Sequence, residues 1–149
     1  MSKEYIVIDL DGTLCDCAHR VHLAAAKQWD EFHSLCHKDQ PFQDLVHIIN
    51  LAARLDSGYI LVAVTGRSEK FRKMTYDWLA KYGLLHKIDK LLMRPDDNFE
   101  KDGQMKLGLL KIEGINPEDI AFALDDRETV VAAFREAGIA CYQVRVGSY

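Results

Sequence analysis

Short apolar runs alternate with helix-length segments along this chain, and that alternation excludes most folds. The runs lie at residues 5–8, 59–64, 90–93, 120–124 and 140–144. Such an order of strands and helices is typical of a parallel sheet covered by helices. Residues 60–64 are apolar at consecutive positions, which fits a strand buried on both faces. The pattern predicts a three-layer α/β fold with about five parallel strands.

The segments between the runs have apolar residues at helical spacing. They predict helices at Asp44–Leu55, after residue 68, at Met105–Ile112 and at Glu128–Ala137. We expect Ser68 to cap the second helix, which ends near Gly83, and Gly138 to stop the last. With 149 residues and 48% hydrophobic composition, the chain can bury one proper core. We therefore expect a single domain over residues 1–149.

Residues 14–41, which we call the lid segment, interrupt the alternation of apolar runs and helix-length segments. They are rich in Cys, His and Ala, with a helical stretch around residues 21–35. The segment falls where it would cover the end of the first strand. We expect a small helical cap there that controls access of the substrate.

Charge and cysteine content narrow the function classes. A net charge of −4 argues against a protein that coats nucleic acid electrostatically, although local recognition of a nucleic-acid end stays open. The chain has no apolar run of eighteen residues, and its four cysteines do not resemble a secreted disulfide framework. We expect a cytoplasmic protein with reduced thiols and no membrane contact.

Polar residues follow the apolar runs at the carboxyl ends of the expected strands, where open parallel sheets bind ligands. They are Asp9, Asp11 and Thr13 after the first strand, Thr65, Gly66 and Arg67 after the second, and Asp125 and Asp126 after the fourth. Lys106 lies near the start of the helix after the third strand. We expect these side chains to converge.

Oxygen ligands dominate this set. Gly12 allows a sharp reversal, so that the Asp9 carboxylate and the Asp11 carbonyl can both face a cation. Asp125 and Asp126 supply further oxygens, and hard oxygen ligands fit Mg²⁺ that is shared with a substrate phosphate. The pattern predicts a magnesium site formed by Asp9, Asp11, Asp125 and Asp126.

The same residues can divide the work of phosphate ester hydrolysis. Asp9 as nucleophile would split the reaction into two displacements through an aspartyl-phosphate. Asp11 is placed to protonate the leaving group and then to deprotonate water. The Lys106 ammonium and the Thr65 hydroxyl would stabilise charge on the phosphoryl oxygens.

Three further residues border this expected site. Arg20 and Arg67 could clamp a phosphate bidentately. Asp102 has two readings, because it could cap the following helix or hold Lys106 in place.

The order of these motifs resembles the haloacid dehalogenase superfamily of phosphatases. The motifs are DLDGT at residues 9–13, VTGR at 64–67, Lys106, and LDDR at 124–127. The chain is most similar to the 3′-phosphatase domain of bacteriophage polynucleotide kinase/phosphatases, over nearly its whole length after residue 4. Details of that similarity are Arg20 eleven residues after Asp9, and Asp102 four residues before Lys106.

The resemblance implies a haloacid dehalogenase-like Rossmannoid fold and removal of 3′-phosphate from polynucleotide ends, in DNA or RNA repair. It implies Asp9 as nucleophile, Asp11 as general acid and base, and Mg²⁺ as cofactor. The implied substrate-binding residues are Thr13, Arg20, Gly66, Arg67 and Asp102. The chain has no P-loop, so a separate kinase or ligase is the candidate partner, in the host cytoplasm if the chain is phage-encoded.

Three alternatives stay open. The motifs do not specify the leaving group, so a 5′(3′)-deoxyribonucleotidase or another small-molecule phosphatase would carry them too. A receiver-type signalling module has similar residues in another order, with its acid pair after the first strand. A zinc site in the lid segment could use Cys15, Cys17, His19, His22, His33, Cys36 and His37, although buried small hydrophobes explain the cysteines as well.

Overall fold

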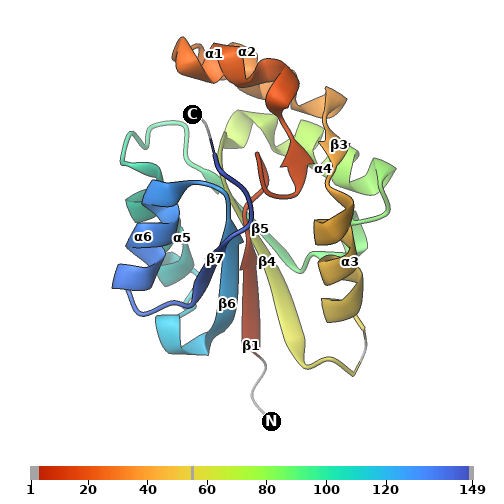
Figure 1. Cartoon of the computed structure of the whole chain (residues 1–149), viewed down its shortest axis with the longest axis vertical. Coiled ribbons are helices and arrows are strands. Elements are labelled where there is room, and N and C mark those ends of the chain that lie inside the picture. The colour runs from red at the N-terminus through yellow and green to blue at the C-terminus, as the bar shows by residue number, and fades with distance from the viewer. Residues whose placement is uncertain (1–3, 55, 148–149) are drawn as a thin grey trace.

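A five-stranded parallel sheet forms the centre of the computed structural model (Figure 1), which describes residues 4–54 and 56–147. The strands are β1 (Glu4–Ile8), β4 (Tyr59–Ser68), β5 (Lys90–Arg94), β6 (Ile120–Asp125) and β7 (Cys141–Gln143). Their spatial order is β5-β4-β1-β6-β7, and every neighbouring pair is parallel. The predicted sheet is confirmed, with β1 in its middle.

Helices cover both faces of the sheet (Figure 1). Helices α3 (Gln43–Ala52) and α4 (Arg72–Lys81) lie on one face, and α5 (Asp102–Ile112) and α6 (Glu128–Glu136) lie on the other. Alternate residues of β1 serve the two cores, because successive side chains of a strand point to opposite faces. Ile6 and Ile8 pack in the core with α3 and α4, and Val7 packs in the core with α5 and α6. The predicted three-layer α/β fold is confirmed.

The four predicted helices are present with small shifts in their bounds. Leu55, the predicted last residue of the first helix, lies outside the described residues. Gly138, with a φ of +87°, follows the end of α6 as predicted. Among the described residues, no helix is long and apolar enough to span a membrane.

The predicted cap at Ser68 is wrong. Strand β4 continues to Ser68, and a 3₁₀ turn at Glu69–Phe71 separates it from α4. Among the described residues, the Ser68 hydroxyl makes no bond that caps a helix. It instead donates to the Asp96 carboxylate in the loop after β5. The hydroxyl therefore links the end of β4 to the loop after β5, a contact between distant residues that local spacing does not reveal.

The lid segment lies beyond the carboxyl ends of the strands (Figure 1). Its elements are β2 (Cys15–Asp16), α1 (Val21–Ala25), α2 (Trp29–Ser34) and β3 (Gln40–Pro41), with 3₁₀ turns at Ala18–Arg20 and Cys36–Lys38. Strands β2 and β3 pair in antiparallel fashion at its base. The expected helical stretch around residues 21–35 is two short helices, because Lys27 between them has a φ of +58°.

Candidate active site

A tight loop after β1 turns Asp9 and Asp11 toward the edge of the sheet. The Leu10 carbonyl accepts the N–H groups of Thr13 and Leu14, at 3.1 and 2.9 Å. Gly12 makes the reversal with a φ of +83°, a conformation that glycine adopts without strain. A Cβ at this position would lie 2.0 Å from Asp126 Oδ2. Glycine therefore both allows the turn and leaves room for an acid from β6.

Three buried carboxylates converge at this edge. Oxygens of Asp9, Asp125 and Asp126 all lie within 4.8 Å of one another, and we call these residues the acid cluster. The Thr13 hydroxyl lies 2.9 Å from Asp9 Oδ2 and 3.4 Å from Asp126 Oδ1, so it can donate to either. The strand ends thus bring these predicted site residues together.

Lys106 reaches the acid cluster from α5. Its Nζ lies 2.8 Å from Asp9 Oδ1 and 2.8 Å from Asp125 Oδ2, and its side chain is only 2% exposed. Burial lowers the pKa of Lys106, but the surrounding carboxylates outweigh burial and raise that pKa well above its ordinary value. The ammonium group is therefore charged and fixed against Asp9.

The charge of the acid cluster bears on whether it fits a cation. Burial and the neighbouring Asp125 raise the pKa of Asp9 well above its usual range, and the same two causes raise the pKa of Asp126. Carboxylates that are held together in spite of their repulsion favour an additional positive charge. Buried oxygen ligands of this type fit Mg²⁺.

Asp11 points away from the acid cluster toward two arginines. Nη2 of Arg20 lies 2.5 Å and Nη2 of Arg67 lies 2.6 Å from Asp11 Oδ1, and both arginine side chains are fully buried. Burial raises the pKa of Asp11, yet the charges of Arg67 and Arg20 outweigh it and hold that pKa far below its ordinary value. Asp11 is therefore ionised in this arrangement.

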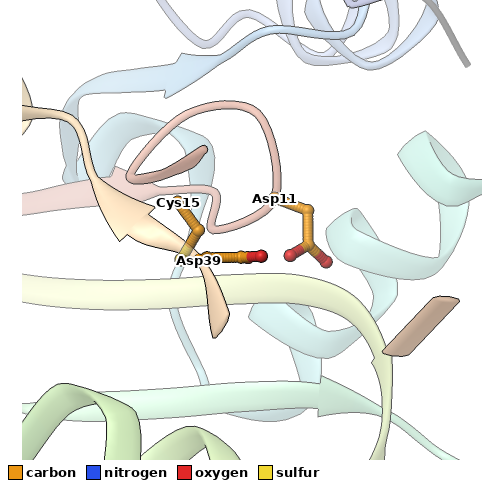
Figure 2. Close-up of side chains that lie close together, drawn as sticks. All are labelled: Asp11, Cys15 and Asp39. Carbon is orange, nitrogen blue, oxygen red and sulfur yellow. The ribbon is translucent and has the colours of Figure 1, made fainter. Parts of the chain in front are cut away.

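Asp39, a residue that sequence reasoning missed, completes this buried charge network. Its carboxylate accepts the Nε–H of Arg20 at 2.9 Å and lies 2.7 Å from Nε2 of His19. Figure 2 shows Asp39 and Asp11 approaching each other from separate segments. The two arginines and two aspartates balance one another, which burial of charge requires. No motif marks Asp39. The signal that could have pointed to it is the need for a second carboxylate once both Arg20 and Arg67 are buried beside Asp11.

The turn after β4 and the start of α5 supply the remaining predicted residues. Buried Thr65 accepts the backbone N–H of Arg67 at its Oγ1, at 3.1 Å. A Cβ at Gly66 would lie 2.6 Å from Asp102 Oδ1, so this position also leaves room for a carboxylate. Asp102 lies 3.4 Å from Lys106 Nζ and 3.0 Å from Arg94 Nη2. Of its two readings, contact with Lys106 is the one that the geometry favours.

Comparison with known proteins decides the family. The family described as the phosphatase domain of polynucleotide kinase PNKP matches residues 3–149. The chain belongs to this family. It is accordingly a phosphatase of the haloacid dehalogenase superfamily, as its motifs suggested. Family membership favours this enzyme class over the receiver-type module.

Individual relatives agree with this family. A putative bifunctional polynucleotide kinase/RNA ligase of Autographa californica nuclear polyhedrosis virus is 29% identical over 128 residues, covering 86% of this chain and 18% of the viral protein. A chain in the Pnkp1/Rnl/Hen1 RNA repair complex superposes with a TM-score of 0.80 and 30% identity, over 100% of this chain and 45% of that chain. The phosphatase chain thus spans less than half of either relative.

More distant structures share the fold alone. A haloacid dehalogenase-like hydrolase from Streptococcus pneumoniae has a TM-score of 0.66 at 16% identity, over 94% of this chain and 83% of that chain. The Rossmannoid architecture that the resemblance implied is therefore confirmed.

The acid cluster of this phosphatase opens into a cleft of about 420 Å³. Its lining includes Asp9, Asp11 and Gly66 from the sheet side and Trp29 from α2 of the lid segment. Within the described part of the chain, Arg20 and Arg67 do not line the cleft but lie behind Asp11. Their predicted contact with a phosphate would require Asp11 to release them.

The zinc alternative gains no support from the lid segment. Within residues 4–54 and 56–147, candidate ligands gather in two groups, which are the acid cluster and the set Asp11, Cys15 and Asp39. The second set surrounds the guanidinium groups of Arg20 and Arg67, which already neutralise its carboxylates. Cys15, Cys17 and Cys36 are buried in the manner of small hydrophobes.

Proposed function

We propose that this chain is a magnesium-dependent phosphomonoesterase that removes the 3′-phosphate from polynucleotide ends through an aspartyl-phosphate on Asp9. The observation that carries the proposal is the convergence of Asp9, Asp125 and Asp126 on Lys106 at the carboxyl edge of the sheet. Membership of the polynucleotide kinase phosphatase family supports the choice of substrate.

Asp9 is oriented for nucleophilic attack by its neighbours. Lys106 holds one carboxylate oxygen and Thr13 holds the other, which fixes the direction of the side chain. In the first step an Asp9 oxygen bonds to phosphorus and the ester oxygen departs. In the second step a water oxygen bonds to phosphorus, the bond from the Asp9 oxygen to phosphorus breaks, and inorganic phosphate and the free carboxylate result. Magnesium held by Asp9, Asp125, Asp126 and the Asp11 carbonyl would neutralise charge, so that an anionic carboxylate can approach an anionic ester.

Asp11 is the proposed proton donor to the leaving oxygen and the proton acceptor from water. An ionised carboxylate cannot donate, so Asp11 must first exchange its contacts with Arg20 and Arg67 and then take up a proton from solvent. The substrate phosphate offers those arginines several acceptor oxygens in return. This exchange would release Asp11 toward the leaving group and place the arginines on the phosphate.

The names of the relatives suggest a setting for this reaction. One relative is named a kinase and ligase, and another belongs to an RNA repair complex. We propose that a separate kinase or ligase acts on the same nucleic acid, and that a ligase would use the 3′-hydroxyl that removal of the phosphate leaves.

A substrate panel tests the proposal. Purified protein, after treatment with EDTA, is assayed for phosphate release with and without Mg²⁺. The substrates are a 3′-phosphorylated oligonucleotide, its 5′-phosphorylated isomer, and free 3′- and 5′-nucleotides. We expect magnesium-dependent multiple turnover with preference for the 3′-phosphorylated end. Strong preference for 5′-mononucleotides would instead identify a nucleotidase.

Two variants test the assigned roles. Asp9→Asn removes the nucleophile at nearly constant volume, so turnover should vanish while the circular dichroism spectrum is unchanged. Asp11→Asn should slow alkyl phosphate esters far more than p-nitrophenyl phosphate, whose leaving group needs no proton. Asp77→Asn, at an exposed position of α4, is the control. Activity retained in Asp9→Asn would refute the assignment of the nucleophile.

A further inference from the structure

Two exposed aromatic side chains border the cleft that contains the acid cluster. Trp29 belongs to α2 of the lid segment and is 41% exposed, and Phe99 belongs to the loop after β5 and is 92% exposed. Exposed rings at the edge of a ligand cleft indicate a binding surface, because a flat aromatic face can stack on a flat ligand. The two rings come from different parts of the chain and line the same cleft.

The Trp29 ring is held in place by its neighbours. It meets Phe32 edge-on at 6.0 Å between centroids and lies over His33 at 6.3 Å with an angle of 26° between the planes. Phe32 is buried, and the Arg20 guanidinium lies 4.2 Å from its ring centroid. A ring fixed in this way is preorganised, so stacking a ligand on it costs little conformational entropy. The same packing connects Trp29 to the arginine behind Asp11.

The charge of the cleft opposes recognition of a long phosphate backbone. Among its lining residues, eight carry a carboxylate and three carry a basic group. All three basic groups already face carboxylates, since Lys70 lies 2.6 Å from Asp30, and Arg94 and Arg127 lie 3.0 and 3.6 Å from Asp102. Proteins that follow a single strand use a positively charged groove together with aromatic rings. This cleft has exposed aromatic rings, but its charged lining residues are mostly acidic.

The size of the cleft agrees with a short ligand. Its volume of about 420 Å³ lies toward the lower end of ligand pockets, which span about 300–1,000 Å³. The cleft includes both the acid cluster and the two exposed rings, so one ligand can reach both.

We propose that Trp29 and Phe99 form a stacking subsite for the base of the terminal nucleotide, and that phosphates further along the strand contribute little to binding. This inference rests on the proposed function, because the phosphate of the same nucleotide must reach Asp9. Stacking accepts any base, so the subsite selects nucleic-acid ends without selecting their sequence. The lid segment thereby supplies substrate recognition through Trp29.

The first experiment compares two trinucleotides with a 3′-phosphate, one intact and one lacking only the 3′-terminal base. The measured quantity is the ratio of kcat/KM for the intact and the abasic substrate. One stacked base corresponds to a factor of roughly 5 to 150, so the ratio should exceed about 5. Trp29→Ala and Phe99→Ala should each bring the ratio toward one.

Control variants separate the loss of a ring from damage to the fold. Ile112→Ala changes an exposed apolar residue at the end of α5 and should keep the natural ratio. Trp29→Phe keeps an aromatic face, so this variant should retain most of the preference for the intact substrate. A ratio of one in the unmodified protein, or a ratio unaffected by Trp29→Ala, would overturn the subsite. Absence of turnover on both trinucleotides would instead refute the proposed function, which makes the two failures distinguishable.

The second experiment tests the claim about the backbone. Values of kcat/KM are measured for 3′-phosphorylated strands of 3, 6 and 12 nucleotides at increasing salt. We expect them to agree within about threefold and to have similar salt slopes, because each extra phosphate contact would steepen the slope by about 0.7. A slope that grows with length would reveal a backbone-binding groove and refute the inference.

Discussion

Removal of the Asp39 carboxylate should destabilise this protein more than removal of an ordinary surface acid. Asp39 is fully buried and accepts two N–H groups of Arg20, at 2.9 and 2.5 Å. In Asp39→Ala, the buried charges of Arg20 and Arg67 would face the single charge of Asp11. Because a buried charge without a partner is costly, the folded state loses free energy that the unfolded chain does not.

The magnitude follows from the burial of the pair. Breaking a buried ion pair by removing one partner costs about 3–5 kcal/mol. A domain has about 5–15 kcal/mol of stability in total, so this loss is a large fraction of it. Denaturation by urea has a slope of about 1–3 kcal/mol per molar for small proteins. The midpoint of unfolding should therefore fall by about 2 M urea.

Urea unfolding followed by circular dichroism measures this effect. Asp39→Asn keeps the shape of the side chain and should lose a similar amount, since charge is the property that both variants remove. Asp77→Ala is the matched control, because its pair with Lys73 is exposed and such pairs contribute less than about 1 kcal/mol. If Asp39→Ala and Asp77→Ala lower the midpoint equally, the argument from charge balance is wrong.

Two further predictions follow from the site. Gly12→Ala would place a Cβ 2.0 Å from Asp126 Oδ2, so phosphatase activity should fall at least about a hundredfold, as misplacement of a catalytic group by 1 Å can cause. Gly58→Ala has a similar positive φ with open space around the position, and activity close to that of the natural protein is expected; equal losses would show that backbone strain is the cause. Burial lowers the pKa of His33 to about 4, whereas an unfolded histidine binds its proton near 6.5. Because the unfolded chain binds more protons between these values, the free energy of unfolding should decrease as pH falls from 6.5 toward 4, by about 2 kcal/mol at pH 5. Urea midpoints at pH 7 and pH 5 should differ less in His33→Gln, and an unchanged difference would contradict the assignment.

The sheet and the acid cluster could be predicted because their signals are local. A strand buried on both faces is apolar at consecutive residues, and the residue that follows it lies at the carboxyl edge. Asp9 and Asp125 were therefore expected at the same edge once the strands were recognised, and the pairing of β1 with β6 brings them together. Lys106 was selected for its place near the start of the helix after the third strand, and the structure places its ammonium 2.8 Å from both acids.

The lid segment was predicted less well for a physical reason. Its helices are short, and a short helix depends on tertiary packing more than on propensity. The break at Lys27 therefore left no clear mark in the apolar pattern. The sequence alone gave no reason to assign a role to Trp29. The structure does, because it places the Trp29 ring at the same cleft as Phe99, which lies 70 positions later in the chain.

The amino-acid sequence by itself determined the order of the strands along the chain, the layers of helices and the acids that follow the strands, because each of these depends on neighbours a few residues away. Only the tertiary structure decided that Asp11 faces Arg20 and Arg67, and that Asp39 supplies the second negative charge that these arginines need. Buried charges must be balanced by groups that lie close to them in space. Arg20 and Arg67 are 9 and 56 positions from Asp11 in the sequence, and they come close to it only when the chain has folded.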